Sequence, residues 1–143
     1  MNSKSGLLIA SAIAALSLMG STITLAADAA PAAAPAKVPT SNKWRVEFDG
    51  SADADGEIVF NLNVAGTITT ITTAIKKGTG ENGVARDLVK ALEKQAPPKK
   101  FHFETDDGEA VYFKKKVGMG VPDFGVELVS NSVPGISIKV KKD

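Results

Sequence analysis

The stretch VARDLVKALEKQ, residues 84–95, decides the fold, because it is the one amphipathic helical pattern that follows the N-terminal region. Its apolar residues recur at every fourth position: Val84, Leu88 and Leu92. Charged side chains occupy the opposite side, as in a helix that packs one face on a core. We expect Asn82 or Thr79 to cap the start of this helix, and the Pro97-Pro98 pair to prevent its continuation.

The three segments before this helix are predicted to be strands. Residues 43–49 (KWRVEFD) and 57–65 (EIVFNLNVA) alternate apolar and polar side chains, which is the period of a half-buried strand. The loop between them is rich in Gly and Asp, so we expect an antiparallel hairpin. Residues 67–77 (TITTITTAIKK) have isoleucines at helical spacing, but five of the eleven residues are Thr, whose branched side chain favours a strand. A bulge is expected near Thr69-Thr70.

Four more strands are predicted after the helix. Residues 100–105 and 110–117 flank Asp107-Gly108, a pair that favours a tight hairpin turn. Residues 124–130 and 135–141 are expected to form a second antiparallel pair. The predicted fold class is therefore α+β, with a curved antiparallel sheet of about six or seven strands, one helix packed on it, and the order βββ-α-ββββ.

The N-terminal region indicates export. Lys4 precedes an apolar stretch at residues 7–20, and small residues follow it, which is the pattern of a secretory signal peptide over residues 1–27. Residues 28–42 are rich in Ala and Pro and predict an extended linker. Residues 43–143 are then a single domain, located in the periplasm or outside the cell and without a stable membrane anchor after cleavage.

Composition narrows the function. The chain has no cysteine, which removes disulfides, thiolate metal sites and a cysteine nucleophile. Without Lys4, basic and acidic residues are equal in number, which argues against specific binding to nucleic acid. Residues 78–83 (GTGENG) match a G-x-G-x-x-G pattern, but hairpins follow the helix in place of further strand–helix units. We therefore interpret these glycines as a turn, and expect no cofactor.

Two further site hypotheses involve acidic residues. A weak candidate calcium site is formed by the carboxylates in and beside one loop: Asp49, Asp53, Asp55 and Glu57. The pattern lacks the last bidentate carboxylate of a calcium-binding loop, so no metal is expected, and a calcium-stabilised adhesion module stays an alternative. His102, the only histidine, alternates with two phenylalanines and is expected on the solvent side. A small exported hydrolase acting through Asp53, Asp55 and His102 is the other alternative.

The binding surface is expected among the lysines of the last four strands. The candidate residues are Lys114, Lys116, Lys139 and Lys141. A face rich in lysines is suited to a protein partner, an anionic surface polymer or copies of the chain itself. The same lysines are also suited to strand edges, where they discourage aggregation.

Residues 75–117 resemble the β–α–β–β insert of flagellins and flagellar hook proteins, known as the hook insert motif. The resemblance is carried by ITTAIKKGTGENG (71–83), VARDLVKALEKQ (84–95) and FHFETDDGEAVYFKKK (101–116). Flagellins lack an N-terminal signal peptide, so the resemblance is one of architecture and not of family membership. Because such inserts are non-enzymatic surface domains, it implies a binding or structural role. The sequence thus predicts an exported, non-enzymatic binding or structural module of the cell envelope or extracellular space.

Overall fold

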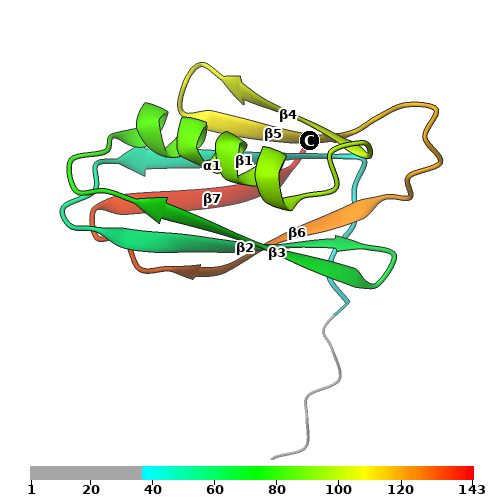
Figure 1. The fold of residues 1–143 in the computed structure, drawn as a ribbon, viewed down its shortest axis with the longest axis horizontal. Coiled ribbons are helices and arrows are strands. Elements are labelled where there is room, and N and C mark those ends of the chain that lie inside the picture. Colours follow the sequence, from blue (N-terminus) through cyan, green and yellow to red (C-terminus); the bar gives the residue numbers. More distant parts are fainter. Residues whose placement is uncertain (1–36) are drawn as a thin grey trace, which may run out of the picture. The chain divides into compact units, whose positions relative to one another are not determined.

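The computed structural model describes residues 37–143. The expected signal peptide and most of the expected linker lie outside the described residues. Seven strands and one helix follow one another in the expected order (Figure 1). The elements are β1 Lys43–Gly50, β2 Gly56–Val64, β3 Thr67–Ile75, α1 Glu81–Gln95, β4 Phe101–Asp106, β5 Ala110–Lys115, β6 Phe124–Asn131 and β7 Ile136–Lys142.

The strands form two antiparallel sheets in place of the single sheet expected. One sheet has the order β4-β5-β1-β7, and the other has the order β3-β2-β6. Their apolar sides belong to one core, in which the rings of Phe60 and Phe113 lie 6.4 Å apart. An alternating strand has one apolar side whether a helix or a second sheet covers it. The alternation pattern therefore could not distinguish the two arrangements.

Only one of the three expected hairpins is present. β4 and β5 pair around a turn in which Asp107 has a φ of 49° and Gly108 a φ of 82°, so the prediction for this pair is confirmed. The other two predictions are wrong, because β1 and β2 belong to different sheets, as do β6 and β7. The loops that follow β1 and β6 cross between the sheets and bond to each other, with the Asp53 N–H donating to the Pro134 carbonyl at 2.9 Å.

Residues 67–75 form a strand, as the threonines predicted, but without a bulge. Pairing between β2 and β3 is continuous from Gly56 opposite Ile75 to Val64 opposite Thr67. The one shift of register in this sheet lies between β2 and β6, next to Val59. The expected bulge at residues 69–70 is therefore wrong.

The helix α1 begins at Glu81, and its N-cap is Gly80, which makes no side-chain capping bond. The expected caps Thr79 and Asn82 are therefore wrong. The buried face of the helix carries Val84, Ala85, Leu88, Ala91 and Leu92. It packs against β3 of one sheet and against β1, β4 and β5 of the other, so it covers one flank of the sandwich.

The last residue of the helix also occupies the free edge of β3. The Gln95 amide accepts a hydrogen bond from the Thr72 N–H at 3.0 Å and donates one to the Thr72 carbonyl at 2.8 Å. These are the two bonds that a neighbouring strand would make at this position. Gln95 thus takes the place of a further strand at the middle of the β3 edge.

Candidate functional site

Charge is separated between the two ends of the sandwich. The loops that follow β1, β3, β4 and β6 gather at one end, and the connections that follow β2, α1 and β5 gather at the other (Figure 1). We call the second the basic end, defined by Lys37, Lys43, Lys94, Lys99, Lys100, Lys114, Lys115, Lys116 and Lys142. The acids there are Glu93, Glu104, Asp123 and Asp143, of which three pair with lysines of this end: Glu104 with Lys114, Asp123 with Lys115 and Asp143 with Lys43. This end is therefore strongly positive, although the described chain is close to neutral.

Strand pairing brings the lysines of the basic end together from distant parts of the sequence. Lys114 lies opposite Lys43 on β1 and opposite His102 on β4. The Lys116 N–H donates to the Lys100 carbonyl at 2.9 Å, which places the connection after β5 beside the one before β4. On the far side of β1, Lys142 lies opposite Trp44. Lysines from four separate segments therefore lie at the same end of the sandwich, with Lys43 and Lys114 on one face of the sheet and Lys142 on the other.

The other end is acidic. It carries Asp49, Asp53, Asp55, Glu57, Glu81, Asp106, Asp107 and Glu109, together with two lysines, Lys76 and Lys77. Backbone bonds hold its loops together: Gly78 N–H donates to the Ala52 carbonyl, and Phe48 N–H donates to the Glu109 carbonyl. The helix N-terminus lies at this end, where a positive partial charge favours the nearby carboxylates.

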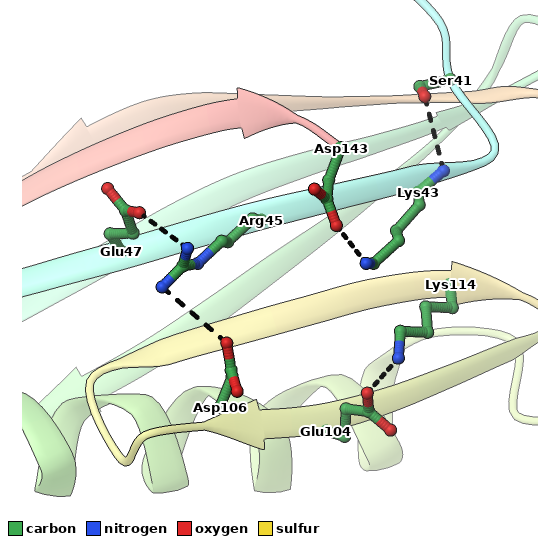
Figure 2. Close-up of polar contacts among 8 residues, drawn as sticks. All are labelled: Ser41, Lys43, Arg45, Glu47, Glu104, Asp106, Lys114 and Asp143. Carbon is green, nitrogen blue, oxygen red and sulfur yellow. Dashed lines mark hydrogen bonds and ion pairs between the residues drawn. The ribbon is translucent and has the colours of Figure 1, made fainter.

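The outer face of the four-stranded sheet, which includes Lys43 and Lys114 of the basic end, is a set of compensated ion pairs. Figure 2 shows Lys43 beside Asp143, Lys114 beside Glu104, and Arg45 between two carboxylates. Those carboxylates are Glu47 at 3.3 Å and Asp106 at 3.8 Å. Because opposite charges alternate across it, this face presents little net charge to a partner.

The same pairs hold their groups in the charged form. A hydrogen bond from Lys114 lowers the pKa of Glu104, and a hydrogen bond from Lys141 lowers the pKa of Glu47. A hydrogen bond to Asp143 raises the pKa of Lys43. Lys43 also lies 4.1 Å from the centre of the Tyr112 ring, a cation–π distance. These lysines are therefore partly committed to partners within the chain.

The four lysines predicted from the sequence do not form one cluster. Lys114 and Lys116 lie at the basic end, and the Nζ of Lys116 donates to the Pro98 carbonyl at 3.2 Å. Lys139 and Lys141 lie on β7, where Lys139 is opposite Glu47 and Lys141 is opposite Arg45. The exposed lysines without a carboxylate partner in the described chain include Lys94, Lys99 and Lys100, which the sequence reading did not select.

The residues of the alternative hydrolase are separated by the length of the sheet. His102 is exposed on β4 at the basic end, with Nε2 3.1 Å from Glu104 Oε2. Asp53 and Asp55 lie in the loop that follows the other end of β1. The described residues bring no nucleophile and no third catalytic group to His102.

The loop of the candidate calcium site is bonded to the turn that contains Lys76 and Lys77. The Asp55 carboxylate accepts hydrogen bonds from Lys76 Nζ at 2.8 Å and from the Lys77 N–H at 2.7 Å. The lysine bond is the largest cause of the lowered pKa of Asp55. Over residues 37–143, no group of three His, Asp or Glu side chains is arranged to hold a metal ion. Asp49, Asp53 and Glu57 therefore lie around this loop without converging on one point.

The glycine-rich segment before the helix serves as a turn. The Gly80 carbonyl accepts hydrogen bonds from the N–H groups of Gly83 and Val84, at 2.8 and 3.0 Å, and so closes the first turn of α1. Ser51 pairs with Gly80 in an isolated bridge, so the loop after β1 lies against this helix start.

Two apolar side chains at the basic end were not singled out from the sequence. In the connection between β5 and β6, Val117 is 99% exposed and Met119 is 54% exposed. The sequence offered a signal, since large apolar residues alternate with glycines in the connection KVGMGV (116–121). Connections between strands run over the surface, so apolar side chains within them are candidates for exposure.

No helix in the described part of the chain has both the length and the apolar character needed to cross a membrane. No family model matches the chain, and searches of curated proteins and solved structures give no match. The resemblance to the hook insert is therefore at most a weak one, below the level of family membership.

Proposed function

We propose that this protein is an exported, non-enzymatic binding module that engages an anionic partner through its basic end. The observation that supports this proposal is the gathering of lysines from four segments at one end of an otherwise balanced chain. Like charges placed together destabilise the free protein slightly, and an anionic partner relieves that repulsion. Export, to the periplasm or beyond, is proposed from the pattern of residues 1–27.

The basic end is better suited to this role than the outer face of the four-stranded sheet. Lys114 and Lys141 already contact Glu104 and Glu47, so a partner would have to compete with these carboxylates. Lys99 and Lys100 are exposed and have no carboxylate partner among the described residues. Their charge is available to a ligand without the breaking of an internal pair.

A binding experiment with poly-L-glutamate tests the proposal. The chain without residues 1–27 is titrated into labelled polymer, and binding is followed by fluorescence anisotropy at increasing salt. One variant combines Lys99→Gln, Lys100→Gln and Lys116→Gln. A matched control combines Lys77→Gln, Lys90→Gln and Lys139→Gln, which removes the same charge from outside the basic end.

Exposed ion pairs contribute about 0.2–1 kcal/mol each, so we expect the first variant to bind about tenfold more weakly and the control to bind as the parent does. Binding should also weaken steeply as salt shortens the screening length. Equal weakening in the two variants would show that only overall charge matters and would remove the basic end as a site.

A further inference from the structure

The connection between β5 and β6 carries an exposed apolar tip, formed by Val117 and Met119, at the basic end. Val117 is 99% exposed and Met119 is 54% exposed. A loop that only joins two strands gains nothing from exposing two large apolar side chains to water. In Figure 1 this connection extends away from the two sheets, so its tip is free to contact another surface.

Exposed apolar residues are concentrated at this end. In the described chain, large apolar side chains are exposed at four positions: Ile68, Val117, Met119 and Val129. Ile68 is the second residue of β3, next to the turn after β2, and so also belongs to the basic end. Only Val129 lies elsewhere, on β6 next to the shift of register. Three of the four exposed large apolar side chains of the described chain therefore lie at the basic end.

The lysines lie directly beside the apolar tip. Lys116 immediately precedes Val117, and its backbone bonds to that of Lys100, which brings Lys99 and Lys100 next to the loop. A soluble anionic polymer offers charge but nothing that would cover Val117. An anionic lipid bilayer offers both, because its headgroups attract lysines and its interfacial region accepts apolar side chains.

We propose that the basic end docks on an anionic lipid bilayer, with Val117 and Met119 inserted at the headgroup boundary and the surrounding lysines on the headgroups. This proposal rests on the proposed function, since it names the anionic partner of the same end. Each lysine near an anionic bilayer strengthens binding about fivefold, and burial of a valine side chain adds about tenfold. Two apolar side chains and a few lysines thus produce reversible attachment.

Vesicle co-sedimentation tests the proposal. The described residues 37–143 lie within one compact unit, so the chain from residue 28 retains the whole of it. That chain is mixed with vesicles of phosphatidylcholine alone or with an equal part of phosphatidylglycerol. The tip variant combines Val117→Ser and Met119→Ser. The control is Val129→Ser, which removes an exposed apolar side chain away from the basic end.

We expect the parent and the control to bind only the vesicles that contain phosphatidylglycerol, and the tip variant to bind them at least tenfold more weakly. The tip variant should still bind poly-L-glutamate as the parent does, which separates the two proposals. Undiminished vesicle binding by the tip variant, or equal binding to both kinds of vesicle, would overturn the lipid proposal alone. If the parent pellets without vesicles, the lipid proposal is overturned in favour of self-association. If the parent binds neither the polymer nor the vesicles, both proposals are removed.

A spectroscopic readout follows insertion directly. Because the chain has no cysteine, Val117→Cys introduces a single site for an environment-sensitive dye, and Val129→Cys provides the matched site. We expect a blue shift on addition of anionic vesicles for the dye at position 117 and none at position 129. The absence of a shift at position 117, when the protein co-sediments, would place the tip outside the bilayer and refute the insertion.

Discussion

Replacing Gln95 with alanine should weaken the domain and expose a sheet edge. The side-chain amide makes two hydrogen bonds to the backbone of Thr72, at 3.0 and 2.8 Å. A typical hydrogen bond contributes about 0.5–1.5 kcal/mol, and both residues are exposed, so Gln95→Ala should cost about 1–2 kcal/mol. That loss lowers the melting temperature by about 5–10 °C in a domain of this size.

The second expected effect is aggregation. Without the Gln95 amide, the edge of β3 presents an uncharged, threonine-rich strand to other molecules, which is an aggregation hazard. Urea denaturation followed by circular dichroism measures the first effect, and light scattering at 37 °C measures the second. Gln95→Ala should shift the urea midpoint and shorten the lag before scattering rises.

Two further variants separate these bonds from the general properties of the helix. Gln95→Glu retains an acceptor for the Thr72 N–H but places a carboxylate oxygen against the Thr72 carbonyl, so at pH 7 it should destabilise at least as much as Gln95→Ala. Lys94→Ala, at the adjacent exposed position, should have little effect. An unchanged urea midpoint for Gln95→Ala, or an equal change for Lys94→Ala, would refute the role assigned to the amide.

Three other outcomes are expected. Three surface carboxyls, those of Glu47, Asp55 and Glu104, have lowered pKa values because lysines donate hydrogen bonds to them. Their stabilising contribution is present above their ordinary pKa values and is lost on acidification through the lowered ones, so urea midpoints should fall between pH 6 and pH 2. Trp44→Phe removes the buried bond from the indole N–H to the Phe124 carbonyl, 2.8 Å long, and should cost about 1 kcal/mol in urea denaturation. Gly125→Ala would place a Cβ 2.6 Å from Val38 Cγ1, so limited proteolysis should cut near Val38 faster than in the parent.

Local sequence signals predicted the elements of this fold well. The Asp107-Gly108 turn, the apolar stripe of the helix and the threonines of residues 67–73 each act within a few residues, and each element is present. The pairing of strands depended on distant contacts. β1 pairs with β5 and β7 and has no ladder with β2, and nothing in its alternation distinguishes these partners.

The candidate site was predictable only in part, because some of its lysines meet through a local hairpin and others through the pairing of distant strands. Lys99, Lys100 and Lys116 meet because β4 and β5 form the predicted hairpin, so their proximity could have been derived from its register. Lys43 joins them only through the pairing of β1 with β5, which is separated from it by more than sixty positions in the sequence. Lys139 and Lys141 were included because they alternate along β7, but their neighbours Glu47 and Arg45 became known only from the sheet order.

The attachment of residues 37–41 to β6 determines how the domain would bear a mechanical load. Ser41 exchanges two backbone hydrogen bonds with Phe124, both 2.9 Å long, and Val38 lies against the bare backbone of Gly125. Tension arriving through the preceding segment meets this small contact first. Once it yields, the force passes to β1, which is held on both sides by β5 and β7 and resists as two ladders sheared together. The contact between residues 37–41 and β6 should therefore break at a lower force than the two ladders that hold β1.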